Sequence, residues 1–224
     1  MATQDCERLV EGLLVQPVNA LSSLAFVLAG IGLAAVSRGS SRGQRLLGAS
    51  FAVALVFVGM GSLAFHGPTG PPADWAHDAS ISTVLLLILI AELGSWRGWD
   101  ARWVVVGWLS TATAIGAVEG LWASVADRLN AVLALAAVIA VVGSRWASPH
   151  HRPRDQDRGA IPAAIAFLVV GAIVMLLSRT GGPLCLPDSP LQGHALWHVL
   201  AASGLGLFAR SVSTDPRWDL EASV

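Results

Sequence analysis

Residues 81–90 read ISTVLLLILI, and from Val84 onward every residue of this stretch is apolar. The strands of a transmembrane barrel alternate between apolar and polar residues, and this stretch does not. Lipid offers backbone groups no water to bond to, so an apolar segment that crosses a bilayer must be helical. The stretch therefore predicts a membrane-spanning helix and indicates the fold class of the whole chain.

Six further apolar stretches lie on either side of this one. Together they predict seven spans, each close to the ~20 residues that cross a bilayer core: 18–36, 46–65, 79–95, 103–119, 129–146, 160–178 and 194–210. Stretches rich in Gly, Pro, Ser and Arg separate the spans and predict loops, at 37–43, 67–72, 148–154 and 181–183. We expect one all-α seven-helix domain over residues 1–224, with a short N-terminal segment at 1–17 and a tail at 211–224.

The composition agrees with a membrane protein. Hydrophobic residues make up 54% of the chain and charged residues 13%, against roughly 45–50% and about 25% in ordinary globular domains. This balance excludes a disordered chain and a coiled coil, and a net charge of −1 leaves no basic field for a nucleic acid. The chain start carries Asp5, Glu7 and Glu11 where a secretory signal peptide would have basic residues. We expect membrane lipids, and no nucleic acid, around this chain; its oligomeric state stays open.

The basic residues are unevenly divided between the two ends of the spans. All 14 are arginines, and an odd number of spans places the chain termini on opposite sides. Eleven of them fall on one side, leaving only Arg8, Arg128 and Arg179 on the other. The positive-inside rule therefore predicts an outer N-terminus and a cytoplasmic C-terminus. Cys6 and Cys185 would both lie outside, where a disulfide and two unrelated small residues are equally good interpretations.

Histidines mark the predicted outer ends of two spans. His194 and His198 are four residues apart at the start of the last span, so they share one helical face. Ser62 and His66 have the same spacing at the end of the second span, which lies at the same membrane level. Three imidazoles and a water are the ligands of an open zinc site. There are three alternatives: the histidines could be unrelated to one another, they could be core residues with satisfied hydrogen bonds, or they could form a proton relay.

A general base would have to come from elsewhere, because Ala195 stands where a zincin motif has its glutamate. Asp78, at the head of the predicted third span, is the first choice. It could instead be the N-cap of that helix, as could Asp74. His77 could be a spare ligand or a partner of the site. His150 and His151 fall in the arginine-rich loop on the other side, where we expect them to be solvated.

These features resemble the alkaline ceramidase family, within the wider superfamily of adiponectin-receptor-like and haemolysin III-like membrane proteins. The shared features are an acidic Cys-Glu start, an Asn and a Ser that open the first span, Ser-x-x-x-His closing the second span, an Asp heading the third, and a His-x-x-x-His motif opening the seventh. In this chain they are Asp5-Cys6-Glu7, Asn19, Ser22, Ser62 to His66, Asp78, and Gly193 to His198. Seven spans in the same order extend the resemblance over the whole chain.

The resemblance implies a zinc amidase that cuts the N-acyl bond of a ceramide-like lipid into a fatty acid and a long-chain base. It implies zinc held by His66, His194 and His198, with Asp78 accepting the proton of the attacking water. Ser62 would steady the metal site or the oxyanion, without help from any phenolic hydroxyl, because the chain has no tyrosine.

The family's eukaryotic members also carry a calcium site, made of acidic residues near the N-terminus. Here only Asp5 and Glu7 match it, and Gln16 stands where a Glu is expected. Calcium dependence is therefore doubtful.

Three other functions compete with this one. The substrate could be another lipid amide or an ester, since nothing in the apolar spans specifies a head group. The chain could be a non-catalytic receptor or structural protein whose zinc ties helices together. A transporter or proton relay is the third. Asp78 distinguishes among them, because only a hydrolase needs a carboxylate near an open metal position.

Overall fold

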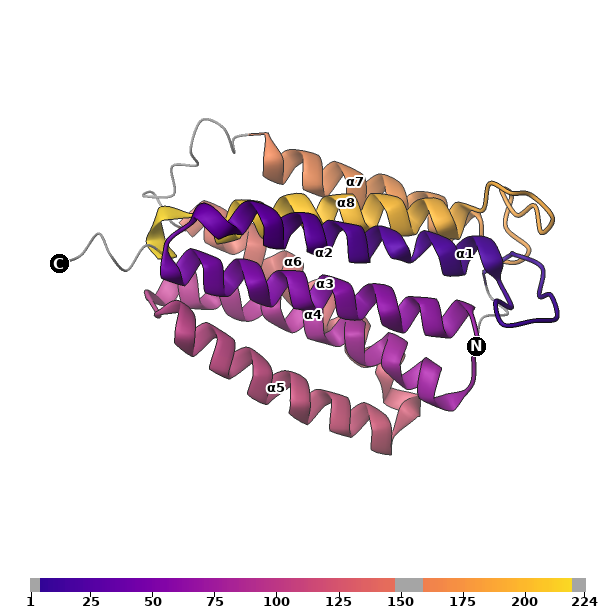
Figure 1. The fold of residues 1–224 in the computed structure, drawn as a ribbon, viewed down its shortest axis with the longest axis horizontal. Helices are drawn as coiled ribbons and strands as arrows, with labels where there is room; N and C mark the ends of the chain where they lie inside the picture. The colour runs from indigo at the N-terminus through magenta and orange to yellow at the C-terminus, as the bar shows by residue number, and fades with distance from the viewer. Residues whose placement is uncertain (1–4, 148–158, 219–224) are drawn as a thin grey trace.

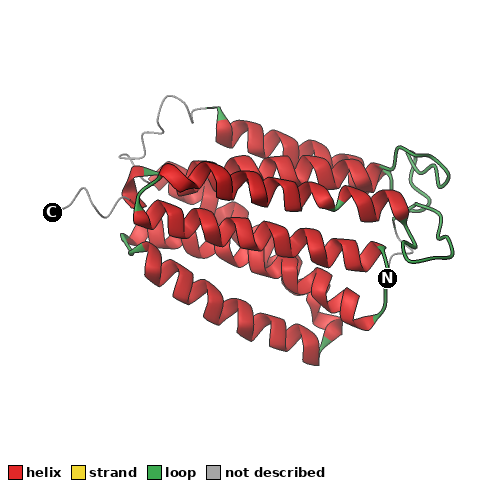
Figure 2. Ribbon diagram, viewed as in Figure 1, coloured by secondary structure: helices red, strands yellow, loops and turns green. Residues whose placement is uncertain are grey.

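The computed structural model describes residues 5–147 and 159–218. The predicted loop at 148–154, with His150 and His151, lies outside the described residues, as do Arg152, Arg154 and Arg158. In the part that is described, every regular element is helical (Figure 2). Seven helical segments of this part are long and apolar enough to cross a membrane, which is compatible with a multi-pass membrane protein.

The main helices run side by side and form a bundle (Figure 1). They are α1 (Pro17–Ser22), α2 (Leu24–Val36), α3 (Arg42–His66), α4 (Pro71–Arg97), α5 (Ala101–Leu121), α6 (Ala126–Ala147), α7 (Ala160–Leu177) and α8 (Gly193–Ser213). Short 3-10 turns lie at η2 (Ser37–Gly39), η3 (Ala123–Val125) and η5 (Pro216–Trp218). The first span comprises α1 and α2, and the fifth comprises η3 and most of α6. A helix long and apolar enough to cross a membrane thus lies at each of the seven predicted stretches, although the ends differ by several residues.

Helices α3 and α4 form the centre of the bundle and are its most buried spans. Helix α3 packs against α2, α4 and α8, while α4 also packs against α5 and α6. Helix α7 lies at one edge and packs on α8. Close approach of α3 and α4 depends on Gly61, where a Cβ atom would lie 2.6 Å from the backbone oxygen of Ala76. Small residues allow this approach, which favours helix association in lipid.

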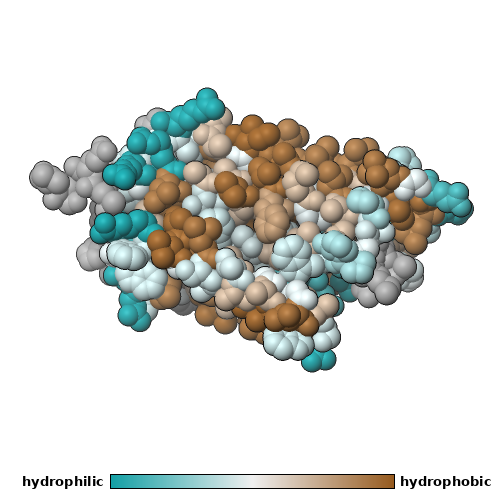
Figure 3. Space-filling view, turned by 60° about the horizontal axis from the view of Figure 1, so that its bottom comes forward, coloured by the Kyte–Doolittle hydropathy of each residue, from teal (hydrophilic) through white to brown (hydrophobic). Residues whose placement is uncertain are grey.

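Large apolar side chains stay exposed along the middle of the bundle, while hydrophilic residues gather toward its two ends (Figure 3). Exposed residues of this kind include Leu28, Val53 and Ile139. A bundle in water would bury such surface, whereas lipid tails solvate it at no cost. The exterior therefore fits a bilayer.

The start of α4 corrects one part of the sequence interpretation. The helix begins at Pro71, with Gly70 as its N-cap, so neither Asp74 nor Asp78 caps it. Proline at the first helical position needs no hydrogen-bond partner for its nitrogen, and its fixed φ angle suits a helix start. The proline-rich stretch at 67–72 is thus partly helix, and Asp78 lies in the second turn.

Candidate metal centre

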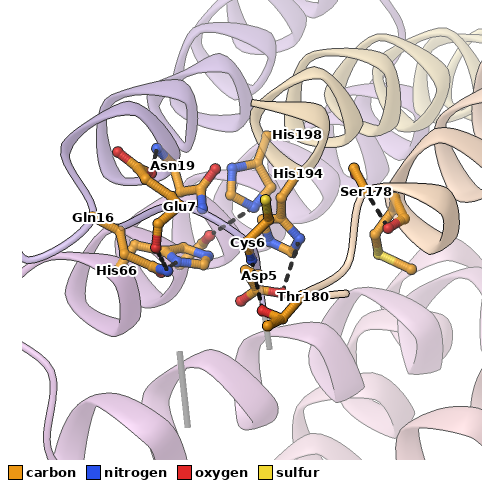
Figure 4. A network of polar contacts seen from close by, with 12 residues as sticks. Asp5, Cys6, Glu7, Gln16, Asn19, His66, Ser178, Thr180, His194 and His198 are labelled. Atoms are coloured by element: carbon orange, nitrogen blue, oxygen red, sulfur yellow. Dashed lines mark hydrogen bonds and ion pairs between the residues drawn. The ribbon is translucent and has the colours of Figure 1, made fainter. Parts of the chain in front are cut away.

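Three histidines meet at one end of the bundle (Figure 4). His66 is the last residue of α3, and His194 and His198 lie in the first two turns of α8. One ring nitrogen from each lies within 4.8 Å of the other two. All three side chains are shielded from solvent: His66 is fully buried, His198 is 3% exposed, and the side chain of His194 is 13% exposed. The predicted convergence of these residues is confirmed.

Each histidine has a partner at Nδ1, and all three partners come from the N-terminal stretch of residues 5–23. Gln16 Oε1 lies 2.7 Å from Nδ1 of His66, and Asp5 Oδ1 lies 3.3 Å from Nδ1 of His194. Ser22 Oγ lies 2.8 Å from Nδ1 of His198. We call this stretch the N-terminal strap.

The contacts of His66 and His194 indicate the tautomers of these two rings. Carboxylate and carboxamide oxygens only accept hydrogen bonds, so His66 and His194 must donate from Nδ1. The Gln16 amide is oriented by its own Nε2 group, which donates to the Glu7 carbonyl at 3.3 Å. The Ser22 hydroxyl lies 2.8 Å from both the Asn19 carbonyl and Nδ1 of His198, so this contact allows either tautomer of His198. Nε2 of His66 and Nε2 of His194 are therefore left with a free lone pair, which is the form that binds a metal.

Two of the three Nε2 atoms are unsatisfied. Those of His66 and His194 are buried without a hydrogen-bond partner among the described residues. A buried polar atom without a partner is rare and calls for an explanation such as an ion. Three imidazoles, each with a polar partner at its other nitrogen, have the ligand type and surrounding contacts common in protein metal sites. The donor set therefore fits a metal ion.

Ser62 lies where the sequence predicts, beside the histidines. Its Oγ is 3.3 Å from Nε2 of His198 and 2.9 Å from the hydroxyl of Ser23. Either hydroxyl of the Ser23–Ser62 pair can be the donor, and Ser23 also contacts the Asn19 carbonyl at 2.9 Å. A hydroxyl is thus held at the edge of the metal-binding cluster.

Asp78 lies farther out. Its carboxylate pairs with Nδ1 of His77 at 3.0 Å, and the side chain is 26% exposed. The His77 ring stacks on Phe65, and its centroid is 6.5 Å from that of His66. Asp78 is therefore connected to the cluster through His77, and its role as a base stays a prediction.

The partners of the histidine rings cannot be assigned from the sequence alone. In the sequence, Asp5 stands out as part of an acidic start and, like Gln16, as a position of a calcium site. Burial raises the pKa of the Asp5 carboxyl to about 6, and the charges of His77 and Arg179 oppose this shift. Glu7 accepts the backbone N–H groups of Val18 and Asn19 at 2.7 and 2.8 Å, at the start of α1. Asp5 thus contacts the His194 ring, and Glu7 contacts the start of α1.

A disulfide holds the strap against the bundle. Cys6 is bonded to Cys185, with 5.5 Å between their Cα atoms. Arg8 adds an ion pair with Asp188 at 2.7 Å. Because Cys6 lies between Asp5 and Glu7, the bridge fixes the part of the strap that contacts His194 and α1 (Figure 4). The disulfide interpretation of the two cysteines is confirmed.

No family model matches the chain, and no curated protein matches it. The resemblance to alkaline ceramidases therefore depends on the residues of this site, and we treat it as a proposal.

Proposed function

We propose that this protein is a membrane-embedded, zinc-dependent amidase of the alkaline ceramidase family. It would hydrolyse the N-acyl bond of ceramide-like lipids to a fatty acid and a long-chain base, with its site toward the extracytoplasmic side. The observation that carries the proposal is the cluster of three shielded histidines, in which one ring nitrogen of each lies within 4.8 Å of the other two and every Nδ1 has a polar partner.

Each side chain of the site would have its own role in hydrolysis. His66, His194 and His198 would hold zinc, which supplies Lewis acidity to activate a water and polarise the amide carbonyl. Asp78 would accept the proton of the attacking water and deliver it to the leaving amine nitrogen. His77 orients the Asp78 carboxylate through their 3.0 Å contact. The Ser62 hydroxyl would stabilise the oxyanion that develops at the carbonyl.

Zinc content and hydrolysis must be measured on the same purified sample. We expect about one zinc per chain, and release of fatty acid from a panel of N-acyl sphingoid lipids in liposomes. His198→Ala should lose both, because it removes one of three ligands. Full zinc occupancy in that variant would exclude His198 from the site. If the protein cleaves esters and not amides, it is still a lipid hydrolase, but the proposed ceramide-like substrate is wrong.

One observation favours a second function, a metal that only ties helices together. The three histidines come from α3 and α8, and Asp78 is 26% exposed and bonded to His77, outside the three-histidine group. A structural site needs the ligands and no base. Wild-type protein that contains zinc but releases no fatty acid from lipid amides or esters would support this function.

A further inference from the structure

A second buried polar cluster lies between α4, α5 and α6. Its members are Glu119 of α5, Ser82 of α4 and Asn130 of α6. Glu119 and Ser82 are 2% and 1% exposed. The Ser82 hydroxyl oxygen lies 2.5 Å from Glu119 Oε1 and 2.8 Å from Asn130 Oδ1. A carboxyl group within membrane-spanning helices is costly and suggests a function.

The hydrogens available to this cluster can be counted. Asn130 donates from Nδ2 to the backbone carbonyl of Asp78 at 3.3 Å, which turns its Oδ1 toward Ser82. Oxygen Oδ1 can only accept, so Ser82 must give it the single hydroxyl hydrogen. The short contact between Ser82 and Glu119 then lacks a hydrogen unless Glu119 brings one. A protonated carboxyl supplies it and satisfies both contacts.

The surroundings of Glu119 agree with a neutral acid. No arginine or histidine of the described residues forms an ion pair with it, and its Oε2 has no hydrogen-bond partner there. An ionised carboxylate buried without a cation or donors would lose its hydration with little compensation. In a neutral acid that donates from Oε1, Oε2 is only a carbonyl oxygen, whose isolation costs much less.

We propose that Glu119 is a proton-binding site, a neutral carboxylic acid that donates to Ser82 and links α4, α5 and α6 through Asn130. This site is separate from the histidine cluster and does not depend on a metal or on hydrolysis. It joins three helices through hydrogen bonds without placing a net charge between them.

Infrared spectroscopy of the full-length protein in liposomes tests the proposal, because the carbonyl band of a protonated carboxyl is separate from carboxylate bands. We expect the wild-type minus Glu119→Gln difference spectrum to contain this carbonyl band, with a shift in D2O. Gln can donate to Ser82 in the same direction, so the variant should keep its thermal unfolding midpoint. Glu92→Gln is the matched control, since Glu92 is also buried and contacts Ser144 at 2.5 Å. This variant should keep the carbonyl band that Glu119→Gln loses.

A second variant, Ser82→Ala, keeps the proposal testable if Glu119→Gln does not fold. In Ser82→Ala the proton should stay on Glu119 but lose its acceptor, so the band should persist and move to higher frequency. Carboxylate bands in place of the carbonyl band in the Glu119→Gln difference spectrum would overturn the proposal. A carbonyl band that Ser82→Ala leaves unmoved would also overturn it, because Ser82 would then not be the acceptor.

Discussion

The orientation of His66 depends on a single carboxamide, that of Gln16, which is fully buried. We expect Gln16→Leu to lower zinc affinity about 10- to 100-fold, the usual cost of removing a hydrogen-bond partner from a metal ligand. Gln16→Glu should keep most of the affinity, because a carboxylate also accepts from Nδ1. Competition with a chelator measures both variants. Equal affinity in Gln16→Leu and wild type would show that His66 is oriented by packing alone.

Asp78 can be tested by a change that removes only its basicity. Asp78→Asn keeps the size of the side chain, so fold and zinc content should survive. Turnover of an N-acyl sphingoid lipid should fall by about 10²–10⁴-fold, the typical contribution of general acid–base catalysis.

Asp74 offers the matched control, one turn earlier in α4 and uninvolved in capping. Asp74→Asn should reduce turnover far less. If Asp78→Asn is as active as wild type, the base must be His77 or Asp74 instead.

Among the helices, the contact between α3 and α4 depends on one glycine near the site. Gly61→Ala places a Cβ atom against the backbone of Ala76, which can move only if the helices separate. Overpacking of this kind costs about 1–3 kcal/mol, so the thermal unfolding midpoint in detergent should fall. Gly32→Ala is the control, because a Cβ there meets no atom within 4 Å. Similar midpoints for both variants would show that α3 and α4 can shift freely.

Apolar length predicts the spans well, because it reflects the thickness of the bilayer core and needs no tertiary information. It predicts their ends less well. Helix α3 begins at Arg42 with a capping box of Ser41 and Gln44, and α4 begins with two prolines, so polar turns extend both helices beyond the apolar core.

The same holds for the site: some of its residues can be predicted from the sequence, and others depend on tertiary structure. The spacing of His194 and His198 is local and visible in sequence, and the level of His66 follows from counting spans. The contacts of Asp5 with His194 and of Gln16 with His66 depend on how the strap folds back over the bundle. The contact of Glu119 with Ser82 depends on which faces three packed helices turn toward one another. No local pattern carries this information.

For the whole molecule, tryptophans and arginines support a membrane orientation. Exposed Trp96, Trp99 and Trp103 lie around the connection from α4 to α5, where Arg97 and Arg102 contact the rings of Trp96 and Trp103. Exposed Trp75 and Trp122 lie toward the opposite end. Aromatic belts of this kind mark both membrane interfaces. We propose that the arginine-rich end faces the cytoplasm.

Two exposed positions at opposite ends test this orientation. Leu191 is 86% exposed before α8, and Trp99 is 41% exposed between α4 and α5. With an impermeant thiol reagent on intact cells, Leu191→Cys should react and Trp99→Cys should react only after lysis. The native cysteines give little background because they are bonded to each other. The reverse pattern would place the histidine cluster on the cytoplasmic side.

The bond between Cys6 and Cys185 also makes the molecule a covalent ring. Six of the seven spans lie inside the ring, and only α8 follows it as a free branch. A protein with one cut in the ring therefore remains a single covalent molecule. We expect a protease site inserted at 98–100 to yield, once cleaved, one band on a non-reducing gel and two after reduction. Two bands without reductant would mean that the ring is open in the membrane.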